Sequence, residues 1–198
     1  PNTVTEPVYS AFNRVPINAA KLQIDSVDYV RHLNNTAATP DNVLMGPTNV
    51  TTSTGAGNYI AGYDAGGSAM TGSENTIAGT EAGNALTSGA NNTLFGKRAG
   101  ASLTIGAGNV LIGKDSADNL TTASNVISIG LDAGAGVTTT ASNGSMYIGR
   151  NTGTGNNGIG QIFIGDDAAH NTGGANNIDN AIVIGASAGA GLIKAGVV

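Results

Sequence analysis

One short motif recurs through most of the chain, and this repetition constrains the possible folds more than any other feature of the sequence. Each unit closes an apolar run with a glycine, as in NTIAG, which ends at Gly79, and NTLFG, which ends at Gly96. A repeat of fixed period is typical of a solenoid, in which each unit packs only on its neighbours. The anchor glycines are Gly46, Gly62, Gly79, Gly96, Gly113, Gly130, Gly149, Gly165 and Gly185.

The spacing of these anchors sets the length of one unit. The intervals between successive anchors are 16, 17, 17, 17, 17, 19, 16 and 20, so the middle of the repeat is regular and its C-terminal third is looser. Other residue types also recur at a fixed distance from the anchors. An aliphatic residue followed by threonine recurs seven positions after an anchor, at Leu86, Leu103, Leu120 and Val137. The nine units therefore cover residues 42–198, and the commonest interval, 17, is the period of the repeat.

The composition favours an ordered β-structure over disorder or helix. Glycine makes up 31 of the 198 residues, but charged residues are only 11% and hydrophobic residues are 40%. Disordered chains show the reverse balance of charge and apolar residues, and glycine suits turns rather than helices. At about 3.3 Å per residue, one unit is long enough for a flattened coil with two short strands and two turns. We therefore predict an all-β fold, a parallel β-solenoid or β-roll of about nine coils.

Five asparagines hold one position of the repeat. They are Asn42, Asn58, Asn75, Asn92 and Asn109. Side-chain amides stacked one coil apart can hydrogen-bond to one another as a ladder. An asparagine can equally cap its own turn through a local hydrogen bond. The sequence leaves both alternatives open, and both predict a structural role for this column rather than a catalytic one.

The strand segments do not alternate between apolar and polar residues as a sheet with one wet face would. The late segments are apolar throughout, at residues 110–112, 146–148, 162–164 and 182–184. A thin coil can hide one face of such a strand inside itself, and exposed apolar patches of this extent usually mark interfaces. We therefore expect another copy of the chain to cover the outer face.

The N-terminal segment, residues 1–41, does not repeat. Its part Asn18–Asn35 has apolar residues at helical spacing, but LQIDSVDYV also alternates as a strand does. We interpret residues 1–41 as an anchoring arm or stem that attaches the solenoid domain, residues 42–198, to a larger body. The alternative is a cap that shields the edge of the first coil.

Catalytic and metal sites are not expected. His32 and His170 lie far apart in the sequence, and no acidic residue stands near either at the spacing of metal ligands. There is no cysteine, which excludes disulfides and thiolate metal sites. No nucleophile, metalloprotease or phosphate-binding motif occurs. We therefore predict no enzyme activity and no cofactor.

The charge balance and the hydropathy argue against two classes of partner, nucleic acids and membranes. The net charge is −5, no basic run occurs, and aromatic residues are 4%, so we expect no nucleic-acid partner. No apolar run reaches the roughly 18 residues of a membrane span, so we expect no membrane insertion. The first residues, PNTVTEPVYSAFNR, lack the charged and apolar regions of a secretory signal.

Most charged residues of the repeat region, residues 42–198, lie one or two positions after an anchor glycine. They are Asp64, Glu81, Lys97, Arg98, Lys114, Asp115, Asp132, Arg150, Asp166 and Asp167. One charge position per coil predicts a stripe along one corner of the solenoid. A solvated corner is the simplest interpretation, and a ligand-binding stripe or ion pairs between chains are the alternatives.

The unit N-T-φ-φ-G-x-x-A-G followed by x-x-L-T-x-G-x-N, where φ is an apolar residue, resembles repeats of bacteriophage tail-fibre-like proteins. It is also similar to the head repeats of trimeric autotransporter adhesins, which are left-handed parallel β-rolls. The resemblance covers residues 42–198 and implies a homotrimeric, non-enzymatic fibre or spike.

From this resemblance we expect a virion structural protein, either a tail fibre or a head fibre that decorates the capsid. The resemblance implies that the N-terminal arm binds other virion proteins on the tail or capsid surface. A glycan or protein of the host surface is a further expected partner. One alternative is a bacterial surface adhesin of the trimeric β-roll type, located on the cell surface. Another is a polysaccharide-degrading tailspike.

Overall fold

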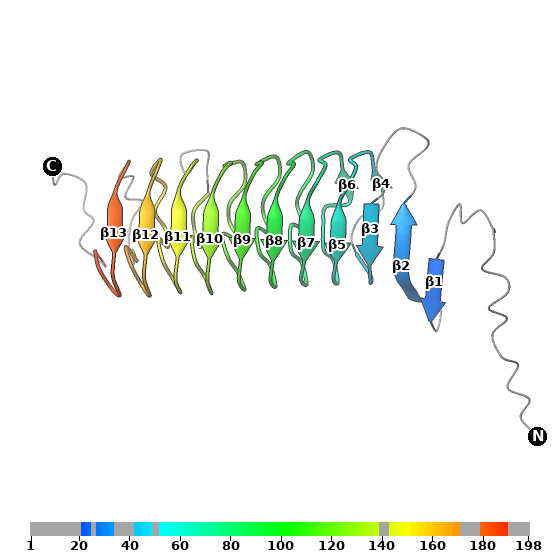
Figure 1. Cartoon of the computed structure of the whole chain (residues 1–198), viewed down its shortest axis with the longest axis horizontal. Coiled ribbons are helices and arrows are strands. Elements are labelled where there is room, and N and C mark those ends of the chain that lie inside the picture. Colours follow the sequence, from blue (N-terminus) through cyan, green and yellow to red (C-terminus); the bar gives the residue numbers. More distant parts are fainter. Residues whose placement is uncertain are drawn as a thin grey trace, which may run out of the picture.

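The computed structural model describes residues 21–24, 27–33, 42–48, 52–138, 143–170 and 179–189, which contain strands and turns but no helix. Eleven strands form one sheet, and two short strands, β4 (Thr52–Ser53) and β6 (Ala69–Met70), form a second one. In Figure 1 the strands of the large sheet stand side by side in chain order. The chain is thus an all-β parallel β-solenoid, as the repeat predicts.

Each of the nine repeat units contributes one strand to the large sheet. From β3 onward every strand pairs in parallel with the next one, and Thr76, for example, lies opposite Thr93. The strands are β3 (Asn42–Met45), β5 (Tyr59–Ala61), β7 (Thr76–Ala78), β8 (Thr93–Phe95), β9 (Val110–Ile112), β10 (Ile127–Ile129), β11 (Met146–Ile148), β12 (Ile162–Ile164) and β13 (Ile182–Ile184).

The predicted period is confirmed by the strand register, because each residue of β5 to β9 lies opposite the residue 17 positions later in the chain. The number of turns is smaller than the nine coils expected. About seven turns run from β3 to β12, and one further interval, which contains residues 171–178, leads to β13. The sequence-based number is higher because it counts one coil for each anchor glycine, and so for each strand, whereas a turn is the path between two successive strands.

The described part of the N-terminal segment is a hairpin. Strand β1 (Lys21–Ile24) pairs antiparallel with β2 (Val27–Leu33), and β2 pairs antiparallel with β3. Of the two sequence-based interpretations for this stretch, strand is therefore correct and helix is wrong. The hairpin covers the backbone edge of the first coil, which the cap alternative requires. What else residues 1–41 bind stays a prediction.

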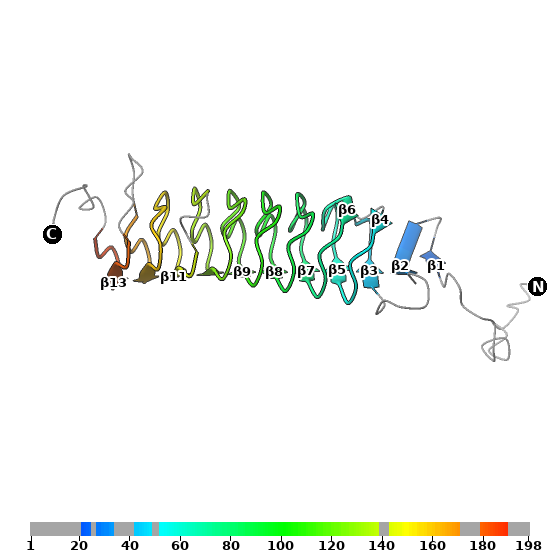
Figure 2. The same cartoon turned by 90° about the horizontal axis from the view of Figure 1, so that it is seen from above.

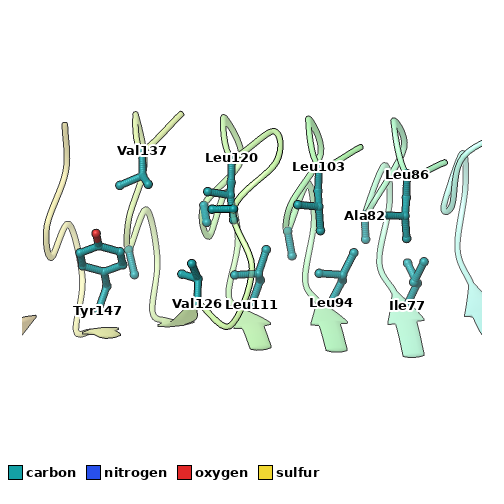
Figure 3. Packing of buried hydrophobic residues seen from close by; sticks show 14 of the residues in the cluster. Ile77, Ala82, Leu86, Leu94, Leu103, Leu111, Leu120, Val126, Val137 and Tyr147 are labelled. Atoms are coloured by element: carbon teal, nitrogen blue, oxygen red, sulfur yellow. The ribbon is translucent and has the colours of Figure 1, made fainter. Parts of the chain in front are cut away.

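The core runs as a continuous column inside the stack. In β5 and in β7 to β12 the central side chain points inward and is buried, as Ile77 and Leu94 show. Figure 2 shows the strands along one side of the stack and the return segments along the other. In Figure 3, Leu86 and Leu103 reach from the return segments toward Ile77 and Leu94. The coils of β7, β8 and β9 therefore each bury two large apolar side chains between their two walls, and stacking joins these layers.

The anchor glycines are required by the close approach of successive coils. A Cβ on Gly79 would lie 2.3 Å from the carbonyl oxygen of Gly96, and a Cβ on Gly96 would lie 2.5 Å from that of Gly113. Their φ values of +143° and +132° also lie in a region that side chains strongly disfavour. The first and last anchors are less confined, since an added Cβ would meet nothing within 4 Å at Gly46 and only Ala188, at 3.6 Å, at Gly185.

Candidate functional site

The five asparagines of the predicted column lie one above the other inside the stack, and all are buried. In the middle of the column each asparagine donates twice to its predecessor. The backbone N–H of Asn75 donates to Oδ1 of Asn58 at 2.9 Å, and Nδ2 of Asn75 donates to the same oxygen at 2.9 Å. Asn92 repeats this geometry on Asn75, and Asn109 repeats it on Asn92. These side chains form a hydrogen-bonded ladder between coils.

The ladder also ties each coil across its own width. Nδ2 of Asn75 donates to the carbonyl oxygen of Gly89 at 3.0 Å, fourteen residues later in the same coil. A Cβ on Gly72 would lie 1.8 Å from that same oxygen, so this second glycine position is as tightly confined as the anchors. Glycine recurs at this position, at Gly55, Gly72, Gly89 and Gly106, and this recurrence is the sequence signal that could have revealed it.

The ladder ends at Asn109. Its Oδ1 accepts a hydrogen bond from the backbone N–H of Val126 at 2.9 Å, and Val126 has no polar side chain to continue the column. Ser145 and Gln161 occupy the equivalent positions in later coils, and Gln161 N–H donates to Oγ of Ser145 at 3.1 Å. The hydroxyl of Tyr147 donates to Oε1 of Gln161 at 2.8 Å. In the later coils, different side chains thus form the buried hydrogen bonds that asparagine forms in the earlier coils.

A second ladder follows the threonines that close each aliphatic-threonine pair. Oγ1 of Thr87 donates to the carbonyl oxygen of Thr104 at 3.0 Å, and Oγ1 of Thr104 donates to that of Thr121 at 2.9 Å. The backbone N–H groups of Thr87 and Thr104 donate to the same two oxygens. Here each coil donates to its successor, so the threonine and asparagine ladders run in opposite directions.

The charged residues recur at one position per coil, as the stripe interpretation expects, and several of them form ion pairs with one another. Arg98 contacts Asp118 at 3.1 Å, Lys114 contacts Asp115, and Arg150 contacts Asp166 at 2.7 Å. Arg98 and Arg150 each reach an acid of the next coil. Exposed ion pairs contribute little to stability, so these pairs add little to the cohesion of the stack.

Three of these groups have shifted pKa values. Burial raises the pKa of the Asp118 carboxyl, and the nearby Arg98 guanidinium offsets only part of that shift. A hydrogen bond to Asp115 raises the pKa of Lys114, and a hydrogen bond to Asp166 raises that of Arg150. Arg150 and Lys114 are exposed.

The outer side chains of the nine parallel strands form what we call the outward strand face. None of its residues is charged, and within β9–β12 they are all half-buried. Ile182 and Ile184 of β13 are 67% and 66% exposed, since no further strand covers them in the described residues. The face consists of Val43, Met45, Tyr59, Ala61, Thr76, Ala78, Thr93, Phe95, Val110, Ile112, Ile127, Ile129, Met146, Ile148, Ile162, Ile164, Ile182 and Ile184.

The two histidines are not brought together. His32 lies in the N-terminal hairpin, whereas His170 lies beside Asp167, with Nδ1 3.9 Å from the carboxylate. Across the described ranges, no group of three or more histidine, cysteine or acidic residues could hold a metal ion. Those ranges also contain no helix that could span a membrane.

The site residues of this protein are therefore arranged as two ladders, one charged corner and one apolar face, all running parallel to the axis of the stack. No protein-family model matches the chain, and neither a curated protein nor a solved structure matches it.

Proposed function

We propose that this protein is a non-enzymatic virion structural protein, a phage fibre or spike on the tail or capsid surface, and that it works as a homotrimer. The observation that carries the proposal is the uninterrupted stack of coils whose polar side chains serve coil-to-coil hydrogen bonds. Such a stack is suited to bearing and transmitting force rather than to chemistry.

The stack is stiff because neighbouring coils are joined at several points around their circumference. Between the coils of β7 and β8 the strand hydrogen bonds act on one wall, the Asn75–Asn92 contact acts inside, and the Thr87–Thr104 contact acts on the far corner. Bending the rod would stretch bonds on one side and compress the close glycine contacts on the other. Nine strands about 4.8 Å apart make a rod about 38 Å long.

The N-terminal hairpin and the residues before it form the base of the proposed spike. Residues 1–41 attach it to other virion proteins, and the solenoid projects away from that attachment. A glycan or protein of the host surface is the proposed contact of the projecting part. The apolar outward strand face supports association between copies, because an exposed face of this kind usually marks an interface.

The first experiment is the mass of the purified chain in solution by light scattering. We expect about three times the 19.4 kDa of one chain. A stable monomer over a wide concentration range would contradict the trimeric spike. Gold-labelled antibodies against the solenoid should then decorate the surface of phage particles, whereas labelling confined to bacterial cells would contradict the virion location.

A further inference from the structure

The outward strand face changes character along the rod. In β9–β13 its ten residues are eight isoleucines, one valine and one methionine. In β3–β8 the eight equivalent residues include two threonines, two alanines and a tyrosine. The C-terminal half of the face is therefore continuously aliphatic, and the N-terminal half is mixed and more polar.

The size of the face shows how much of it an occupant has to cover. A stable interface has about 20 to 30 residues on each side, and the whole outward strand face supplies eighteen. The ten aliphatic residues alone are too few, so a stable partner has to follow the full length of the rod. A short peptide does not meet this requirement, whereas a second copy of the same rod does.

The spacing of the side chains also matches a second copy. The columns of the face repeat at the distance between strands, about 4.8 Å, and a partner with the same repeat can interdigitate at every step, as identical sheets do in dry zippers. The absence of charge on the described face avoids repulsion between copies, because the charged residues lie at the neighbouring corner.

We propose that copies of the chain pack through this face in parallel, with β9–β13 of one copy on β9–β13 of the next. This inference rests on the proposed oligomeric function and specifies the interface. A parallel arrangement places isoleucine on isoleucine along half of the rod. An antiparallel arrangement centred on β9 would place β12 on β5, so that Ile162 and Ile164 would meet Tyr59 and Ala61 and lose this match.

The direction is tested with spin labels on single cysteines, which the chain allows because it contains no cysteine. Thr80 and Ala186 are exposed and follow equivalent anchor glycines in the coils of β7 and β13. In the parallel arrangement, Thr80→Cys and Ala186→Cys give the same distance between like labels. In the antiparallel arrangement the labels are offset along the rod by about 19 Å and about 38 Å, and unequal distances of this kind overturn the proposal.

The face is tested by Ile148→Asp, with Ser88→Asp, at an exposed position on the far corner, as the matched control. A charge in the aliphatic half should weaken association about 100-fold or more, whereas the control should leave the mass unchanged. Circular dichroism checks that both variants keep their β-structure, and the milder Ile164→Thr replaces Ile148→Asp if that variant does not fold.

The outcomes separate this inference from the proposed function. A monomeric wild-type chain defeats both. A wild-type oligomer that Ile148→Asp and Ile164→Thr do not weaken defeats the interface proposed here and leaves the spike proposal standing.

Discussion

The ladder half, β5–β10, and the C-terminal third, β11–β13, build the same coil in two different ways. In the ladder half each strand follows the last at a constant interval, and asparagine joins most of the coils. In the C-terminal third the interval changes, because Met146 pairs with Ile162 but Ile162 pairs with Ile182. There Ser145 and Gln161 take the place of asparagine. The core there contains aromatic side chains, with the ring centroids of Tyr147 and Phe163 5.8 Å apart.

The difference shows what a constant period contributes. Identical side chains can bond to one another from coil to coil only if every coil is the same size. Once the loops vary, each coil has to satisfy its buried backbone separately, as Ser145 does with Gly158 and Asn156 does with Ala169. The buried Oδ1 of Asn156 has no hydrogen-bond partner, so this local solution is less complete than the ladder.

The largest expected effect comes from adding a Cβ to one anchor glycine in each region. Gly96→Ala and Gly165→Ala both place a Cβ 2.5 Å from a carbonyl oxygen of the next coil. We expect each to destabilise its own region by on the order of 4 kcal/mol. Because solenoid coils are coupled mainly to their neighbours, hydrogen exchange should show Gly165→Ala opening the C-terminal third while the ladder half stays protected.

The control for these variants is Gly144→Ala. Gly144 has a φ of +70° but nothing lies within 4 Å of its added Cβ, so only backbone strain of about 1 kcal/mol is expected. Equal loss of protection along the whole rod in Gly165→Ala would show that the two regions unfold as one unit.

A second test of the two regions removes one buried polar side chain from each, at equivalent positions of the repeat. Asn92→Ala removes the side-chain links to Asn75, Gly106 and Asn109 and leaves buried groups without partners. Its free energy of unfolding, measured with denaturant, should fall by about 3 kcal/mol. Ser145→Ala removes two longer hydrogen bonds and should cost about 1 kcal/mol. Equal costs would mean that the ladder adds nothing beyond its separate bonds.

The smallest expected effect concerns pH. Since burial raises the pKa of Asp118, the folded chain keeps a proton that the unfolded chain releases, and stability falls as pH rises from the ordinary value of 3.8 through the raised one. Asp118→Asn should remove this fall. Denaturation midpoints at pH values from about 3 to about 6 would measure it, with Thr80→Asn as control. A fall that persists unchanged in Asp118→Asn would assign it to another group.

Much of the regular half could be predicted from the sequence, because repetition shows which positions are equivalent. The period, the parallel strands and the phase of Asn75 and Asn92 all follow from counting residues. The direction of the threonine bonds did not follow, since a threonine in a turn has several local acceptors. The tight contact at Gly72 was missed for a similar reason, because glycine marks both loose turns and close approaches.

The C-terminal third was less predictable because each of its coils forms its own set of buried hydrogen bonds. Nothing in the sequence alone indicates that Tyr147 reaches Gln161, since the two residues belong to different coils and no other coil repeats the pair. A cap on the edge of the first coil was one of the two interpretations of residues 1–41, but the antiparallel pairing of β2 with β3 could not be predicted, because the hairpin lies outside the repeat.

The direction of the asparagine ladder has a consequence for how the chain is made. Each asparagine donates to the one before it, so a new coil finds its acceptor already in place on the coil completed earlier. At about 5 to 20 residues per second, a ribosome releases one such coil every few seconds. The rod can therefore grow from its capped N-terminal end as it is translated, with each finished coil serving as the template for the next.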